Sequence, residues 1–522
     1  MLAHTWFDDG RYADAEHAYA ELASRLPPGD PQAGEVTERL AASVYRQAEA
    51  KQQAGNAAGA VQDFLRVAVV APQSPAAAKG QYDAATLLIA AKDWAGAAQV
   101  LERFRADYPQ DELQPEVTRR LAVVYQEGGR GHDAAVELER VAARDSEDPE
   151  VRRAALWQAA ELYAASADPA GARRAYTEYV ARFPTPIDAA IEARQELALI
   201  CATAGDQAAA THWLEEIVAA DAAAGSARTD RTRFLAAQAS LELAEPLDAD
   251  ARAVTLAAPL DRSLARRKAA MESALAAWSR AADYGISSVT THATFAMADL
   301  YRDFGAALLA SQRPAGLSAE ELEQYDLLLE EQAYPFEEKA IGIHEMNAQR
   351  AASGTWDEWV IGSYAALAKM KPARYQRQER LDAPDAAPGT APEVLAAMAA
   401  AHASLEQGKP EAAIEQLQPA LAIDPANAVA LNMRGVALRR TGQFAAARSA
   451  YETAIAGSPG YATPERNFGI LLDLYLNEPA AALPHYERYQ QLTGDTDPDA
   501  GPWLVELRTR LGQVQRTAEV QP

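Results

Sequence analysis

One spacing recurs along this chain and constrains its fold more than any other feature. A small or turn residue is followed by Ala five positions later, by an aromatic residue or Leu at nine, and by Pro at seventeen. Six segments fit the frame: Gly10, Ala15, Tyr19, Pro27; Gly55, Ala60, Phe64, Pro72; Lys92, Ala97, Leu101, Pro109; Ala167, Ala172, Tyr176, Pro184; Gly408, Ala413, Leu417, Pro425; Gly442, Ala447, Tyr451, Pro459. Weaker copies start at Gly129, Gly205 and Asn477, so the sequence predicts nine repeated units.

The frame describes the second helix of a helical hairpin. The turn residue ends helix A, the Ala lets helices A and B approach closely, and the large residue fills the space between them. Pro then ends helix B because it has no N–H to donate. Each hairpin leaves one apolar face uncovered, so the units must stack on one another. This pattern is typical of the tetratricopeptide repeat (TPR), and it predicts an all-α superhelical solenoid.

The composition suits a solenoid and argues against several classes of function. A chain of 522 residues is too long for one compact core, whereas each unit of a solenoid contacts only its neighbours. The formal net charge of −25 argues against binding nucleic acid through its phosphates, which requires a basic face. The single cysteine, Cys201, excludes a disulfide within the chain and is expected to be a buried thiol. No run of about eighteen apolar residues occurs, so no membrane-spanning segment is expected in this sequence.

No residue pattern predicts catalysis, a metal ion or a cofactor. His344 and Glu345 begin like the helix of a zinc protease, but Ala348 stands where the second His would be. No two histidines are four positions apart, and neither a phosphate-binding Gly-rich loop nor a nucleophile elbow occurs. The sequence therefore predicts a non-catalytic chain whose partners are proteins or peptides.

The spacing of the turn positions divides the chain into parts. From Gly55 to Gly205 the turns are 37 or 38 residues apart, and from Gly408 to Asn477 they are 34 or 35 apart. We therefore expect an N-terminal TPR array at 1–222 and a C-terminal array at 393–522 that ends in a capping helix and a polar tail. A middle segment at 223–381 is helical by pattern but has divergent repeats. The Pro- and Ala-rich residues 382–392 are expected to form a linker.

The middle segment carries two clusters of opposite charge. An acidic cluster lies between positions 314 and 338, where no basic residue occurs, and a basic cluster follows it. The acidic cluster is Glu320, Glu321, Glu323, Asp326, Glu330, Glu331, Glu337 and Glu338; the basic candidates are Lys369, Lys371, Arg374 and Arg377. Either the two clusters form solvated faces that pair with each other, or the four basic residues dock an acidic partner.

Two tryptophans and two polar residues are further candidates for partner binding. Trp356 and Trp359 are three positions apart, so they are expected to share a helix face. There they either pack in the core or form a binding hot spot. Asn432 and Arg439 lie on a predicted helix A and could grip an extended peptide, although any exposed helix carries such residues.

Three stretches of the middle segment resemble a known group of proteins. At Tyr334–Asn347, Gly354–Val360 and Ala368–Tyr375, the chain resembles large bacterial TPR proteins associated with TonB, ExbB and ExbD energy-transducing systems. The resemblance covers about residues 325–380. It implies a Gram-negative periplasmic protein that helps couple an inner-membrane proton-driven motor to outer-membrane components, with no catalytic residue. The N-terminal units, with their Tyr-Pro and Phe-Pro endings, are also similar to envelope TPR proteins of the Tol-associated and outer-membrane-assembly type.

The first unit is short. Only nine residues precede Gly10, whereas about fourteen residues of helix A precede the turn in a full unit. We therefore expect the chain to be a fragment, in which case the absence of a signal peptide says nothing about its compartment.

Together these features predict a non-catalytic scaffold for protein–protein interactions in the periplasm. The scaffold is expected to belong to a TonB-type cell-envelope complex, with inner- or outer-membrane proteins among its partners. One alternative is a cytoplasmic TPR adaptor or chaperone-like module that holds extended peptides. A second alternative is an enzyme or regulatory domain in the missing N-terminal sequence.

Overall fold

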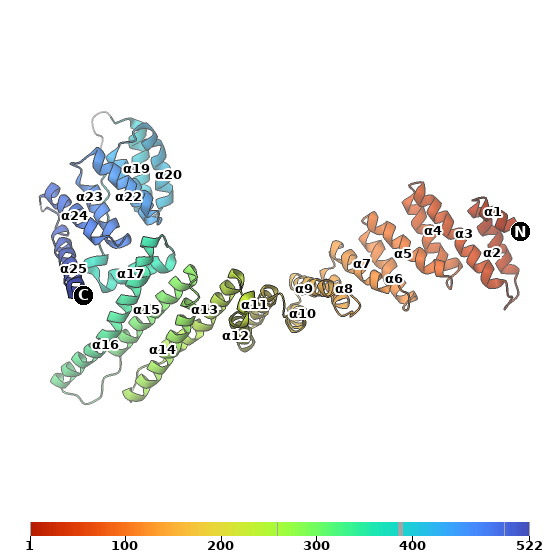
Figure 1. The fold of residues 1–522 in the computed structure, drawn as a ribbon, viewed down its shortest axis with the longest axis horizontal. Helices are drawn as coiled ribbons and strands as arrows, with labels where there is room; N and C mark the ends of the chain where they lie inside the picture. The colour runs from red at the N-terminus through yellow and green to blue at the C-terminus, as the bar shows by residue number, and fades with distance from the viewer. Residues whose placement is uncertain (1, 258, 385–389, 495, 521–522) are drawn as a thin grey trace. The chain divides into compact units, whose positions relative to one another are not determined.

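The computed structural model describes residues 2–257, 259–384, 390–494 and 496–520. Within these ranges the regular structure is all helical, with no strand, so the predicted all-α fold is confirmed. The chain divides into two compact units, unit 1 (Met1–Thr232) and unit 2 (Arg233–Pro522), which run from red to olive and from green to blue in Figure 1. The four-part organisation expected from the sequence stays a prediction, and residues 385–389 of the expected linker lie outside the described residues.

Unit 1 is a series of helical hairpins. Its helices are α1 (Leu2–Asp8), α2 (Tyr12–Arg25), α3 (Ala33–Gln53), α4 (Ala57–Val70), α5 (Pro75–Ala90), α6 (Trp94–Asp107), α7 (Gln114–Glu127), α8 (Gly131–Ala142), α9 (Pro149–Ala165), α10 (Pro169–Arg182), α11 (Ile187–Thr203) and α12 (Gln207–Ala223), followed by the 3-10 helix η1 (Gly225–Ala227). Each helix packs on the next along the chain, as stacked hairpins require.

Unit 2 begins with longer helices and ends in shorter hairpins. Its helices are α13 (Asp230–Ala253), which starts just before the unit boundary, α14 (Leu260–Ala282), α15 (Ser287–Leu309), α16 (Ala319–Ala348), η2 (Gln349–Ser353), α17 (Glu358–Met370), α18 (Pro372–Tyr375), α19 (Pro392–Glu406), α20 (Pro410–Ile423), α21 (Ala428–Arg440), α22 (Phe444–Gly457), α23 (Ala462–Ile470), η3 (Leu471–Tyr475), α24 (Pro479–Thr493) and α25 (Ala500–Val520). Helices α13 to α16 have between 23 and 30 residues each, longer than any helix described in unit 1.

The turn position of every predicted unit has a left-handed backbone. All nine residues have φ between 52° and 80°. Six of them are Gly, which adopts this conformation without strain, and the other three are Lys92, Ala167 and Asn477. In the six strong frames the Pro follows the last residue of helix B by two positions. The predicted hairpin boundaries are confirmed.

Burial follows the same frame. In the six strong units the Ala is 0% exposed and the large residue is at most 3% exposed. Several B helices also start with a side-chain cap: Asn56, Asp93, Asp168 and Asp206 each accept a hydrogen bond from the N–H three residues on. The repeat frame therefore sets both where a helix begins and how closely it packs.

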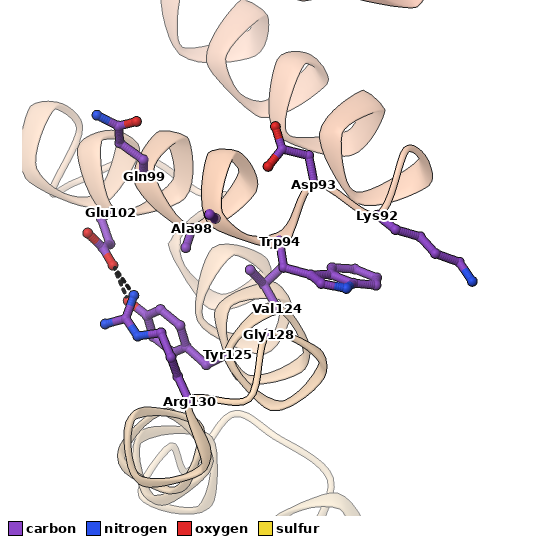
Figure 2. A pocket seen from close by; sticks show the side chains of 11 residues that line it. Lys92, Asp93, Trp94, Ala98, Gln99, Glu102, Val124, Tyr125, Gly128 and Arg130 are labelled. Carbon is purple, nitrogen blue, oxygen red and sulfur yellow. Dashed lines mark hydrogen bonds and ion pairs between the residues drawn. The ribbon is translucent and has the colours of Figure 1, made fainter.

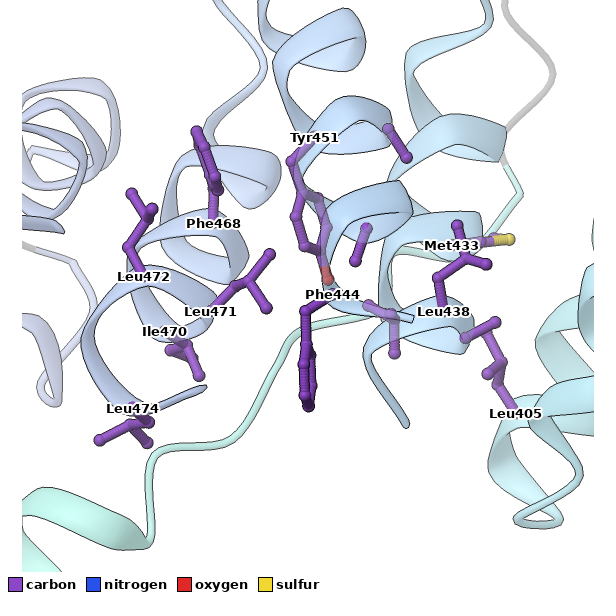
Figure 3. Packing of buried hydrophobic residues seen from close by; sticks show 14 of the residues in the cluster. Leu405, Met433, Leu438, Phe444, Tyr451, Phe468, Ile470, Leu471, Leu472 and Leu474 are labelled. Carbon is purple, nitrogen blue, oxygen red and sulfur yellow. The ribbon is translucent and has the colours of Figure 1, made fainter. Parts of the chain in front are cut away.

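The largest core of unit 2 joins the C-terminal hairpins to the residues before them. In Figure 3, Tyr451 of α22 lies beside Phe468 of α23, with 6.1 Å between ring centroids, and Phe444 of α22 belongs to the same core. Ala351 and Val360, which precede α19, belong to the same core. The C-terminal hairpins of unit 2 are therefore packed against α17 and its neighbours.

Three expectations about single features can be compared with the structure. Within the described ranges, no helix combines the length and apolar character needed to cross a bilayer. Those ranges also contain no cluster of three or more His, Cys, Asp or Glu side chains that suits a metal ion. Cys201 is buried as predicted, and burial raises the pKa of its thiol.

Because each unit has its own stacked core, we predict that overpacking one unit destabilises it alone. Ala172→Leu in α10 and Ala447→Leu in α22 place a large side chain where helices A and B touch, which costs about 1–3 kcal/mol. Hydrogen exchange should show lost protection in unit 1 for the first variant and in unit 2 for the second. The controls are Ala170→Leu and Ala446→Leu, at exposed positions of the same helices. Simultaneous loss of both units in both variants would contradict this account.

Candidate functional site

An irregular segment of unit 2 lies against two helices of the C-terminal repeats. We call residues 377–382, which follow α18 and form neither helix nor strand, the inserted segment. We call Asn432, Arg439, Arg466 and Asn467, which project from α21 and α23, the repeat face. All four side chains of the repeat face hydrogen-bond to the inserted segment.

Two asparagines hold the main chain of the inserted segment. The Asn467 side chain accepts a hydrogen bond from the Arg380 N–H at 2.8 Å and donates one to the Arg380 carbonyl at 2.8 Å. Asn432 donates to the same carbonyl at 3.5 Å, and Asn467 donates to Asn432 at 2.9 Å. Arg466 holds the carbonyl of Gln378 with two N–H groups, at 3.1 and 3.2 Å. Asn432 and Asn467 therefore satisfy both the N–H and the carbonyl of Arg380, as a neighbouring β-strand would.

A buried carboxylate of the inserted segment fixes its register. Glu379 is held by the guanidinium of Arg439, with one bond of 3.0 Å, and accepts a hydrogen bond from the Tyr451 hydroxyl at 3.1 Å. Burial would lower the pKa of Arg439, but Glu379 reverses this, so the pKa is raised overall. Burial and the same carboxylate raise the pKa of Tyr451. Both oxygens of the Glu379 carboxylate therefore accept hydrogen bonds from Arg439.

A second charged side chain of the inserted segment enters the core. Arg377 and Asp473 both have side chains that are 0% exposed, and they form an ion pair. The other end of the Arg377 guanidinium binds Glu506, and Tyr486 lies within hydrogen-bond distance at 3.2 Å. Burial would lower the pKa of Arg377, but Tyr486, Asp473 and Glu506 together raise it by more. Arg377 therefore links α18 to η3 and α25.

These contacts make the inserted segment part of the folded unit. Withdrawing it would leave Asp473 and Arg439 with fewer partners in poorly solvated surroundings, and breaking one buried charge pair costs about 3–5 kcal/mol. The repeat face is thus covered by the inserted segment of the same chain. Asn432 and Arg439 contact the inserted segment of their own chain, and their role in binding a partner stays a prediction.

The remaining basic candidates lie elsewhere. Lys371 and Arg374 form ion pairs with Glu345 of α16, at 3.1 and 3.2 Å, and Lys369 is exposed. Glu345 lies beyond the acidic cluster of residues 320–338, so among the described residues the two clusters do not pair with each other in the way that one alternative required. Docking of an acidic partner by the basic cluster stays a prediction, although Arg377 is buried.

The expectation that Trp356 and Trp359 share a helix face is wrong. Helix α17 begins at Glu358 because the Asp357 side chain caps it, accepting hydrogen bonds from the N–H groups of Trp359 and Val360, so Trp356 precedes the helix. Trp356 donates to the Arg440 carbonyl at 3.3 Å. Trp359 instead stacks on His292 of α15 with 3.7 Å between ring centroids. The two tryptophans therefore pack against different neighbours, and a role as a binding hot spot stays a prediction.

Unit 1 contains a cavity of about 480 Å³ between α6 and α7, shown in Figure 2. In its lining, the Tyr125 hydroxyl donates to Glu102 at 2.6 Å and Arg130 pairs with Glu102 at 3.3 Å. The next unit repeats the arrangement, since the Tyr163 hydroxyl donates to Glu139 at 2.7 Å and Arg174 pairs with Glu139 at 3.0 Å. The polar groups of this cavity thus belong to a repeated contact between successive helices, which favours a structural role.

Sequence reasoning missed part of the repeat face. Asn467 lies 35 residues after Asn432, and both stand ten residues before the turn of their unit. That periodic placement was a usable signal for Asn467. Glu379 had no such signal, because the inserted segment has no repeat.

The main-chain contacts at Arg380 yield a stability prediction. Asn467→Ala removes both hydrogen bonds and leaves the N–H and carbonyl of Arg380 short of partners, which should destabilise unit 2 by about 1–3 kcal/mol. The Arg380 amide should also exchange its hydrogen faster. Gln378→Ala is the matched control, because its side chain is exposed and its carbonyl stays available to Arg466. Equal stability and equal exchange in Asn467→Ala and wild type would contradict the prediction.

Comparisons with known proteins agree with the repeat frame. Models described as tetratricopeptide repeat match residues 88–156, 154–186 and 398–462. A comparison with curated proteins finds no match. Among solved structures, Naa15/Naa10 bound to HypK-THB is 14% identical with a TM-score of 0.28, covering 93% of this chain and 67% of that chain. The APC/C hetero-tetramer Cut9–Hcn1 is 10% identical with a TM-score of 0.23, covering 89% of this chain and 96% of that chain. Neither TM-score supports a structural argument. The repeat matches and the observed hairpins identify an all-α solenoid that carries tetratricopeptide repeats in both units.

Proposed function

We propose that this protein is a non-catalytic scaffold that binds other proteins in a periplasmic, TonB-type cell-envelope complex. The tetratricopeptide repeats in both units are the observation that supports a scaffold for protein–protein interactions. Stacked helical repeats offer long surfaces on which separate proteins can be held, and each repeat contributes its own part of the surface.

The covered repeat face favours folded partners over extended peptides in unit 2. A peptide-holding adaptor needs free side-chain amides and cations that can take a partner's main chain and carboxylates. In unit 2 those groups bind Glu379 and the main chain of Arg380. Partners of unit 2 would therefore bind to surfaces other than the repeat face. The cytoplasmic peptide-holding alternative would have to rely on unit 1.

The envelope part of the proposal rests on the resemblance within residues 325–380. The resembling stretches include the C-terminal part of α16 and the two ends of α17, with Trp356 and Tyr375 packed against the C-terminal core. Five large apolar side chains of residues 325–380 are exposed, and two of these are Met346 at 56% and Ile361 at 46%. Through Met346 and Ile361, this segment would contact an inner- or outer-membrane component of such a complex.

The test is crosslinking in cells of the tagged full-length gene product, followed by affinity purification and mass spectrometry, with cell fractionation in parallel. We expect a periplasmic fraction and recovery of TonB-, ExbB- or ExbD-like proteins or of outer-membrane proteins. Met346→Glu combined with Ile361→Glu should lose most of this recovery, because it places charge in an apolar contact. The control is Val69→Glu, at an exposed apolar position of unit 1.

Two results would overturn parts of the proposal. Recovery of soluble cytoplasmic proteins alone would remove the envelope role and leave a peptide- or protein-binding solenoid. Recovery of no protein above the background of the untagged strain would remove the scaffold function itself.

A further inference from the structure

Helix α17 connects two parts of unit 2. It packs on α15 and α16, and its residue Val360 belongs to the core of the C-terminal hairpins. Trp359 and Ser363 lie one turn apart on α17, and each contacts a histidine of a neighbouring helix. Trp359 stacks on His292 of α15, and the Ser363 hydroxyl lies 3.3 Å from Nδ1 of His344 on α16. The contact of α17 with α15 and α16 therefore contains two titratable rings.

His344 belongs to a buried polar cluster that ties the three helices together. We call His344, Asn347 and Ser363 the His344 cluster; all three residues are 0% exposed. The Asn347 side chain donates to the Ser363 hydroxyl at 2.9 Å and to the Thr291 carbonyl of α15 at 3.2 Å. The Ser363 hydroxyl donates to the Trp359 carbonyl at 2.9 Å. The cluster thus has hydrogen bonds to groups of α15, α16 and α17.

These hydrogen bonds determine the state of the His344 ring. Ser363 has one hydroxyl hydrogen, which it donates to the Trp359 carbonyl, so Nδ1 of His344 must be the donor toward the Ser363 oxygen. In a neutral ring Nε2 then carries no hydrogen, and this buried atom has no hydrogen-bond partner among the described residues. A proton on Nε2 would add a charge and a donor that nothing there compensates. The geometry therefore favours the neutral ring.

The charged groups near His344 do not offset the cost of protonation. Asp299 and Arg302 of α15 act on the ring in opposite directions, and Asp299 already pairs with Arg302 and Arg252. The side chain that α17 presents, Ser363, is neutral. Burial therefore dominates and lowers the pKa of His344 from 6.5 to about 4. Because the pKa is lowered in the closed contact, the contact is most stable above pH 6.5 and loses stability as the pH falls toward 4.

His292 acts in the same direction but is less isolated from water and charge. Its ring is partly exposed and lies between Trp278 of α14, with 5.4 Å between ring centroids, and Trp359, with 3.7 Å. Burial lowers the pKa of His292, whereas Glu358 and Asp357 at the start of α17 oppose this shift. We therefore assign the main response to His344.

From this arrangement we propose that protonation of His344 releases α17 from α15 and α16 in mildly acidic solution. The open form takes up the proton because water then reaches both ring nitrogens, and the closed form does not. Release loosens the connection between helices α13 to α16 and the C-terminal hairpins. This inference goes beyond the scaffold function and depends on neither the partners nor the compartment of the protein.

The test measures hydrogen exchange of the full chain at about pH 7.5 and about pH 5, with each rate corrected for the intrinsic pH dependence of exchange. Protection of residues 358–370 should fall by about tenfold or more at the lower pH, because only the open form binds the proton readily. Helix α7 of unit 1 should keep its protection, which separates local release from general acid unfolding. His344→Gln, which has no titrating ring, should lose most of the response.

The matched control is His212→Gln, at an exposed position of α12, which should keep the wild-type response. A second measurement needs no variant: NMR of the wild-type chain with labelled histidine rings should show a ring that stays neutral where the exposed rings are already protonated. The proposal is overturned by equal protection of residues 358–370 at both pH values, by a full response in His344→Gln, or by histidine rings that all titrate together. None of these results affects recovery of partners by crosslinking in cells, so failure of this inference is distinguishable from failure of the scaffold function.

Discussion

The fold depends on a small residue where the two helices of each hairpin meet. An alanine such as Ala172 or Ala447 has no exposed surface, and the aromatic ring one turn later fills the space that this close approach creates. A hairpin of this kind leaves an apolar face open, so it is stable only when another element covers that face. In unit 1 the cover is the next hairpin. In the C-terminal part of unit 2 it also includes a segment of the chain without regular structure.

The inserted segment shows how a repeat surface can be used within its own chain. The repeat face supplies paired asparagines for main chain and arginines for carboxylates and carbonyls, which are the groups that hold an extended ligand. Because Arg377 and Glu379 are buried with their counter-charges, the segment stabilises unit 2 and keeps this face from other ligands. Large apolar side chains stay exposed elsewhere in unit 2, among them Leu327, Leu328 and Tyr334 on α16.

Much of the hairpin structure could be predicted from the sequence because the repeat is local. The turn residues, the buried alanines and the terminating prolines act within a single hairpin, and the structure confirms all three. The predicted binding of a partner peptide by Asn432 and Arg439 stays a prediction, and in the structure both residues contact the inserted segment. The contact between the repeat face and the inserted segment could not be predicted, because Arg380 and Asn467 are 87 residues apart and the inserted segment has no periodic pattern. The prediction that Trp356 lies on a helix with Trp359 was wrong, because Asp357 caps α17 and the helix begins only at Glu358.

The central claim is that the chain's own residues 377–382 occupy the repeat face permanently. The most direct test adds a labelled synthetic peptide with the sequence of residues 374–384 to the intact protein and follows fluorescence anisotropy. The account predicts no saturable binding up to about 1 mM peptide, because the intramolecular segment holds the site. Saturable micromolar binding, with faster hydrogen exchange in residues 377–382 of the chain, would contradict it and would mean that the repeat face is open to partners.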